Sequence, residues 1–211
     1  EHIELRSLAS GRFPRVPISE VHDFRDRMAD SGLTLSGVSP GFFKCAIDDP
    51  MVPEDLASTL PRACEWALEL GTNRVSSFAF NRGDDDAMPG AVIDRMSEMA
   101  RIVAASGCRL SLENEAGCWG GSGVEAIDIL RQIGDGVGLC YDPGNSARSG
   151  NPAHFPEEYH QVRQLVTHLH MKNFDTANDR WSLIEAGVID WQGQLQALDV
   201  DGYDGFAVIE T

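Results

Sequence analysis

Apolar and polar residues alternate along this chain in two different patterns. Short apolar runs predict buried strands, and longer segments with apolar residues at every third or fourth position predict amphipathic helices. The predicted strands cover residues 3–6, 33–38, 74–80, 108–113, 137–142, 166–172 and 206–210, and the predicted helices cover residues 17–30, 55–70, 91–106, 124–133, 155–165 and 191–198. Three segments lack either pattern: a polar loop over 81–86, a flexible glycine-rich loop over 117–123, and an irregular stretch over 181–186.

Strands and helices follow one another in turn, which is typical of parallel strands joined by crossover helices. A doubly wound sheet is one such α/β arrangement, but no Gly-x-Gly-x-x-Gly motif follows any strand. The alternative is a (β/α)8 TIM barrel. Because seven strands are predicted, we expect that the first strand and helix and the closing helix of a barrel are absent from the sequence given. Without a visible linker or repeat, residues 1–211 are expected to form a single domain.

The composition is ordinary for a globular protein, with 42% hydrophobic and 24% charged residues among 211. A net charge of −16 disfavours nucleic acid as a partner, because it repels phosphate groups. No apolar run is long enough to predict a membrane span. Five scattered cysteines without a Cys-x-x-Cys pair favour free thiols in a reducing compartment, so we expect a cytoplasmic protein.

Four predicted strands carry metal-binding side chains at their carboxyl ends. These residues are Glu113, Asp142, His170 and Glu210. In a (β/α)8 barrel this end of each strand faces the active site. Three carboxylates and one imidazole suit Mn²⁺, Mg²⁺, Co²⁺ or Zn²⁺, and a divalent ion would offset the repulsion between clustered carboxylates. Each residue alone is better explained as a helix cap or a core residue, so the prediction depends on the set of four.

Five short motifs extend over nearly the whole chain. They are Leu112-Glu-Asn114, Tyr141-Asp-Pro-Gly-Asn145, His168-Leu-His-Met-Lys172, Gly187-Val-Ile-Asp-Trp191 and the segment from Gly202 to Glu210. Together they resemble the sugar phosphate isomerase/epimerase family, the xylose-isomerase-like TIM barrels. The motifs are specific for this superfamily and unspecific for the substrate.

The resemblance implies that Glu113, Asp142, His170 and Glu210 bind one divalent metal ion. It also suggests substrate contacts, for which the candidates are Glu115, Asn145, His168, Lys172 and Trp119. His168 lies one step deeper than His170 and is expected to support it. Lys172 would hold a substrate oxygen or phosphate at the rim, and Trp119 would form an apolar wall or anchor its own loop.

Two positions depart from the family pattern. Many members have histidine where this chain has Asn145, and this difference argues against the multi-zinc DNA-repair endonucleases of the superfamily. Many relatives also have histidine where this chain has Glu115, which would bind a sugar hydroxyl or cap the following loop. His154 could reach over the pocket from a later loop, although an exposed position is the simpler expectation.

The implied reaction moves a proton at a carbon next to a carbonyl of a sugar, through an enediolate stabilised by the metal. Glu113 and Glu210 are the expected catalytic residues, which remove and return the proton. A metal-dependent dehydratase or lyase acting on a keto-sugar or polyol is the main alternative. A carbohydrate-binding barrel without catalysis is a third. Relatives are often oligomers, so we expect a possible homodimer or homotetramer.

Overall fold

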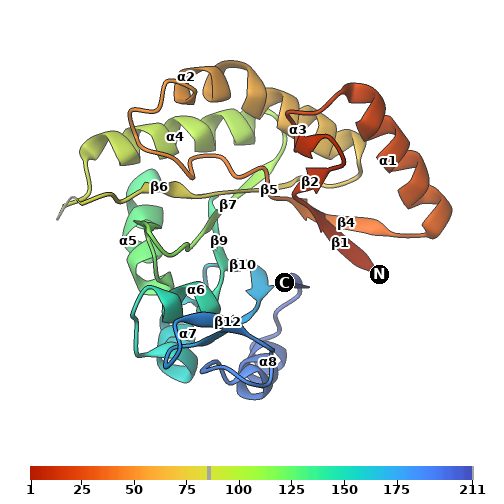
Figure 1. Ribbon diagram of the computed structural model, residues 1–211. Helices are drawn as coiled ribbons and strands as arrows, with labels where there is room; N and C mark the ends of the chain where they lie inside the picture. The colour runs from red at the N-terminus through yellow and green to blue at the C-terminus, as the bar shows by residue number, and fades with distance from the viewer. Residues whose placement is uncertain (85–86, 211) are drawn as a thin grey trace.

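The computed structural model describes residues 1–84 and 87–210, and its main feature is one parallel sheet (Figure 1). Seven strands pair in the order in which they occur along the chain: β1 (His2–Leu5), β4 (Thr34–Val38), β5 (Arg74–Ser77), β7 (Arg109–Glu113), β9 (Gly138–Tyr141), β10 (Val166–Met171) and β13 (Phe206–Ile209). A doubly wound sheet reverses its strand order at one point, and this sheet does not. The prediction of a barrel-type α/β fold is therefore confirmed.

The sheet is nearly closed into a barrel, and side chains link its first and last strands. The rings of His2 and Phe206 lie 4.7 Å apart, and the Arg6 guanidinium pairs with the Glu210 carboxylate. Arg74 donates an exposed hydrogen bond to the backbone carbonyl of Thr167 at 3.2 Å. The first two contacts hold β1 close to β13, and the third links β5 to β10.

Helices cover the outer side of the sheet, as the alternation predicts (Figure 1). They are α1 (Ile18–Ser31), α2 (Val52–Glu54), α3 (Leu60–Glu69), α4 (Gly90–Ala105), α5 (Gly123–Ile133), α6 (Pro143–Arg148), α7 (Tyr159–Val162) and α8 (Trp191–Val200). A wide helical turn at Asp55–Thr59 joins α2 to α3, and another at His154–Glu158 precedes α7. The α5 helix shows why these segments fold. Ser122 caps its first turn by accepting a hydrogen bond from Glu125 N, and its apolar face is buried. No described helix is long and apolar enough to cross a membrane.

The strand predicted over 74–80 is two strands, which belong to different sheets. After β5 the chain turns away from the barrel, and Phe80 adopts a left-handed conformation with φ of 64° while its ring stacks on Phe43 at 4.2 Å. The turned segment forms β6 (Ala79–Asn81), which pairs antiparallel with β8 (Cys118–Trp119). Part of the glycine-rich segment over 117–123 is therefore a strand. The polar loop predicted over 81–86 includes residues 85 and 86, which lie outside the described residues.

Two other segments also differ from the prediction. The Pro143-Gly144 break begins α6, because Asp142 accepts a hydrogen bond from Asn145 N at 2.8 Å and proline fits the first helical position. The irregular stretch over 181–186 contributes to a hairpin of β11 (Asn173–Asp175) and β12 (Arg180–Ser182). A second small hairpin joins β2 (Ser7–Leu8) to β3 (Gly11–Arg12).

The fully buried Asn114 joins the carboxyl ends of β7 and β9. Its Oδ1 accepts a hydrogen bond from Asp142 N at 2.8 Å, and its Nδ2 donates to Asp142 O at 2.7 Å and to Ser146 Oγ at 3.0 Å. Backbone groups buried at a strand end need such partners, because the sheet no longer supplies them. Asn114 therefore fixes the direction in which the chain leaves β9.

Gly138 lies where β9 passes close to β10, and this contact generates a first prediction. A Cβ atom at position 138 would overlap with the Thr167 hydroxyl and methyl groups. Gly138→Ala should lower the free energy of unfolding by about 1–3 kcal/mol, as overpacking does. Thr167→Ala in the same protein should recover part of this loss, and urea unfolding of the four proteins in the double-mutant cycle measures the coupling. Gly90→Ala is the matched control, because its Cβ would meet no atom within 4 Å. Additive losses would contradict the proposed contact.

Asn114→Ala should lower the free energy of unfolding by at least about 2 kcal/mol. The substitution leaves the buried N–H of Asp142 without its partner, which costs roughly 1–3 kcal/mol. It also removes the two hydrogen bonds that Asn114 Nδ2 donates to Asp142 O and Ser146 Oγ, each of which contributes about 0.5–1.5 kcal/mol. Gln132→Ala removes an amide of similar size from the exposed face of α5, where Gln132 donates only to the carbonyl of Asp128, and should change stability little. Equal stability of the two variants in urea would argue against the structural role of Asn114.

Candidate metal centre and pocket

Four side chains converge at the carboxyl ends of the strands, as the sequence predicts. Ligand atoms of Glu113, Asp142, His170 and Glu210 all lie within 4.8 Å of one another. Glu113 closes β7, Asp142 follows β9, His170 lies in β10, and Glu210 follows β13, where its N–H donates to Met171 O at 3.0 Å. Neighbouring parallel strands bring their ends to one edge, so residues up to 97 positions apart form one cluster.

His170 lies between carboxylates from two sides of the barrel. Its Nδ1 is 3.1 Å from Glu113 Oε1 and 3.8 Å from Glu210 Oε2, and its Nε2 is 2.8 Å from Glu4 Oε2. Burial alone would lower the pKa of this imidazole, but neighbouring groups, including the Glu113 carboxylate, raise it well above its ordinary value. Nδ1 is therefore the nitrogen that faces the cluster, and Nε2 can donate its proton to Glu4.

The sequence analysis did not identify Glu4, which supports this histidine pair from β1. Its Oε1 lies 3.2 Å from His168 Nε2, and its side chain is buried. Burial opposes ionisation of Glu4, but the hydrogen bonds and positive charge of His168 and His170 outweigh it and lower its pKa. The signal in the sequence was a single acid in the short predicted strand over 3–6, which could not be linked to the histidines without knowing that β1 faces β10.

Asp142 is the most deeply buried carboxylate of the cluster. Burial raises its pKa to about 7, although the charges of Lys172 and His170 act in the opposite direction. The Lys172 ammonium lies 2.8 Å from Asp142 Oδ2 and 2.7 Å from Glu210 Oε2. Asp142 Oδ2 nevertheless has no hydrogen-bond donor of good geometry within residues 1–84 and 87–210. One cation thus lies between two of the four candidate ligands.

These residues fit a divalent metal ion. Three carboxylates and one imidazole make an oxygen-rich set, and Asp142 Oδ2, which has the Lys172 ammonium beside it but no well-aligned donor, can still accept a cation. A second group formed by Cys140, His168 and His170 has ligand atoms equally close together. Burial raises the pKa of Cys140 to about 12, which works against the thiolate form that binds metal ions. The carboxylate-rich group is therefore the better candidate.

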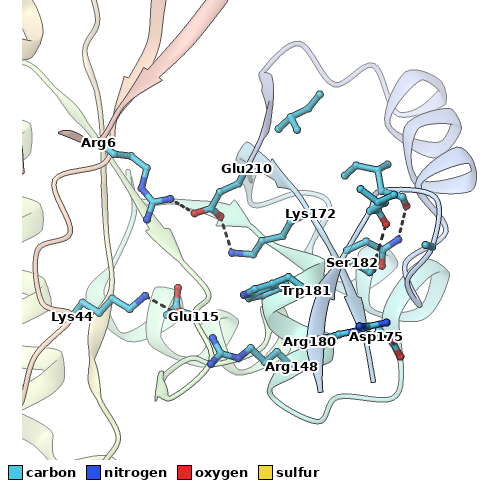
Figure 2. Close-up of a pocket in the computed structure, with 15 residues that line it drawn as sticks. Arg6, Lys44, Glu115, Arg148, Lys172, Asp175, Arg180, Trp181, Ser182 and Glu210 are labelled. Atoms are coloured by element: carbon cyan, nitrogen blue, oxygen red, sulfur yellow. Dashed lines mark hydrogen bonds and ion pairs between the residues drawn. The ribbon is translucent and has the colours of Figure 1, made fainter. Parts of the chain in front are cut away.

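A pocket of about 770 Å³ opens beside the cluster (Figure 2). Glu210 is the one member of the four candidate ligands that lines it, together with Lys172 and Glu115. Glu115 is buried and its Oε1 lies 3.0 Å from Lys44 Nζ. Trp181, from the unpredicted β12 strand, forms an apolar wall of the pocket. The predicted contacts Glu115 and Lys172 therefore lie at the pocket, although their roles stay predictions.

The other predicted contacts lie away from the pocket surface. Asn145 is fully buried and donates to Asn114 O at 2.9 Å, and His168 lies beneath the cluster against Glu4. Trp119 is buried in the core with the Arg82 guanidinium over its ring at 4.8 Å, which fits its alternative role as a loop anchor. His154 is half-buried at the start of a wide helical turn. Any role of these four residues toward a substrate stays a prediction.

Comparisons with known proteins agree with this architecture. A family described as xylose isomerase-like TIM barrel matches residues 1–211. An uncharacterized protein of Methanocaldococcus jannaschii is 29% identical over 147 residues, which are 68% of this chain and 47% of that protein. The chain thus spans about half the length of this curated relative.

Solved structures show the same fold at low sequence identity. A xylose isomerase-like TIM barrel protein from Mycobacterium smegmatis in complex with magnesium is 24% identical, with a TM-score of 0.74 over 93% of this chain and 72% of that one. An L-ribulose 3-epimerase is 18% identical, with a TM-score of 0.75 over 100% and 71%. A probable 3-DHS dehydratase from Bacillus anthracis is 15% identical, with a TM-score of 0.75 over 92% and 76%. The strand order, the position of the clustered ligands and the match over all 211 residues establish that this chain belongs to the xylose isomerase-like TIM barrel family.

Proposed function

We propose that this chain is a divalent-metal-dependent isomerase or epimerase of a sugar or sugar derivative. The observation that carries the proposal is the convergence of Glu113, Asp142, His170 and Glu210 beside the 770 Å³ pocket. A pocket of this size suits a small molecule. The fold's likeness to an L-ribulose 3-epimerase and membership of the family support a carbohydrate substrate.

A divalent ion held by Glu113, Asp142, His170 and Glu210 would supply Lewis-acid polarisation of the substrate oxygens next to the reacting carbon. Glu210 is the carboxylate on the pocket wall, so it is the group best able to take a proton from that carbon. Burial would raise its pKa, but Lys172, His170 and Arg6 outweigh burial and lower it, which keeps Glu210 ionised as a base must be. Glu113, held by His170 on the far side of the cluster, is the second acid–base candidate.

Three pocket residues would orient the substrate. Lys172 is a hydrogen-bond donor next to Glu210 and can hold a substrate oxygen close to the proton-transfer group. Glu115 can accept a hydrogen bond from a hydroxyl, and its Lys44 partner keeps it in place. The Trp181 ring offers an apolar face to the carbon skeleton and excludes water from one side.

Glu210→Gln should reduce solvent deuterium exchange at the carbon next to a substrate carbonyl by about a hundredfold or more, because general base catalysis supplies that order of rate. The measurement is mass spectrometry of a panel of ketoses and aldoses incubated in heavy water with metal-loaded protein. Glu65→Gln, an exposed glutamate on α3, is the control and should exchange like the wild type. Deuterium exchange at the wild-type rate by the Glu210→Gln variant would show that Glu210 is not the proton-transfer group. Loss of water from a substrate, without isomerisation, would instead identify a dehydratase.

The protein should bind one equivalent of Mn²⁺ or Mg²⁺, and Glu4→Gln should weaken that binding about 10- to 100-fold. Glu4 would orient His170 through Nε2, and partners of this kind commonly affect metal affinity to that extent. Isothermal titration after chelation measures the affinity, and circular dichroism checks that the fold is kept. Glu65→Gln again serves as the control. A Glu4→Gln protein that binds metal with wild-type affinity would exclude the positioning role.

A further inference from the structure

The pocket beside the cluster has an excess of positive charge in a strongly acidic chain. Its lining includes five cationic side chains, Arg6, Lys44, Arg148, Lys172 and Arg180, against the three carboxylates of Glu115, Asp175 and Glu210. The chain as a whole carries a net charge of −16. A concentration of cations in one pocket of an acidic protein needs an explanation, and the simplest explanation is recognition of a negatively charged ligand.

Most of these cations are already paired with a carboxylate. Arg6 pairs with Glu210, Lys44 with Glu115, and Arg180 lies 3.5 Å from Asp175 in an exposed position. Arg148 differs, because it has no carboxylate within ion-pair distance in the described part of the chain. It ends α6, the helix whose first turn is capped by Asp142. The backbone of Arg148 is thus positioned by a helix that begins next to Asp142, and its exposed guanidinium is available to bind an anion.

Trp181 connects Arg148 to the reaction centre. The Arg148 guanidinium lies over its ring at 5.5 Å from the centre, and the Lys172 ammonium lies over it at 4.6 Å. The two cations are therefore within roughly 10 Å of each other, a separation that suits the two ends of one small molecule. Figure 2 shows Arg148 and Lys44 extending toward the same open space beside the Trp181 ring.

We propose that the substrate carries an anionic group, a phosphate or a carboxylate, at the end away from its reacting carbon, and that Arg148 binds this group with help from Lys44. The guanidinium offers paired N–H donors that match both groups in a bidentate way. Lys172 and Glu210 then contact the reacting end, and Trp181 lies along the carbon chain between them. The inference rests on the proposed sugar-modifying function and narrows its substrate class.

The test measures binding to the whole chain in the presence of Mg²⁺ by isothermal titration calorimetry. The probes share one carbon skeleton: D-fructose, D-fructose 6-phosphate and D-fructuronate. At least one of the two anionic probes should bind about tenfold or more tightly than fructose, because charge-assisted hydrogen bonds contribute that much. Preference for the phosphate or for the carboxylate identifies which anion the site takes.

Arg148→Gln should remove this preference and leave fructose binding unchanged. Arg131→Gln is the matched control, since Arg131 lies exposed on α5 and its change in net charge is the same. Equal binding of all three probes, no binding by any of them, or equal effects of the two substitutions would overturn the proposal. Deuterium exchange on fructose without any anion preference would refute the anionic site and leave the isomerase proposal standing. Anion preference without deuterium exchange on any probe would refute the isomerase proposal and leave the anionic site standing.

Discussion

The structure depends on how this barrel accommodates four carboxylates around one imidazole. At 4 Å, two like charges repel by about 4 kcal/mol when the effective dielectric constant is about 20. Here Glu4, Glu113, Asp142 and Glu210 surround His170, and the ligand atoms of the latter three carboxylates all lie within 4.8 Å of it and of one another. His170, Lys172 and Arg6 supply the positive charge that makes this arrangement possible. The same requirement for a cation makes the cluster suited to a divalent ion.

This charge requirement also explains why closure of the barrel and assembly of the site are linked. Arg6 joins β1 to Glu210 after the last strand, and Glu4 joins β1 to the histidines of β10. The contacts that bring the first and last strands together are therefore the contacts that orient the candidate ligands. A change that separates β1 from β13 would disturb the cluster even if every ligand residue were kept.

The sequence predicted the sheet and the four clustered residues because both depend on local patterns. An apolar run that ends in an acid is visible in a short window, and parallel strands bring such ends together in any barrel. Helix α6 and Glu4 were missed for different reasons. Pro143-Gly144 is compatible with both a turn and a helix start, and only the hydrogen bond from Asn145 N to Asp142 distinguishes them. The role of Glu4 can be recognised only when it is known to lie opposite His168 and His170, which are more than 160 positions away in the sequence.

The two tryptophans show why the lining of the pocket was harder to predict than the cluster of candidate metal ligands. The sequence analysis named Trp119 and not Trp181 as a candidate contact, although both occur in segments without strand or helix periodicity. Pairing of β6 with β8 buries Trp119, whereas pairing of β11 with β12 turns Trp181 toward the pocket between two cations. Each hairpin is fixed by tertiary contacts, such as the packing of Phe174 on Trp181 at 5.1 Å. In this barrel the rigid strand ends determine which chemistry is possible, and loop packing determines which molecule reaches it.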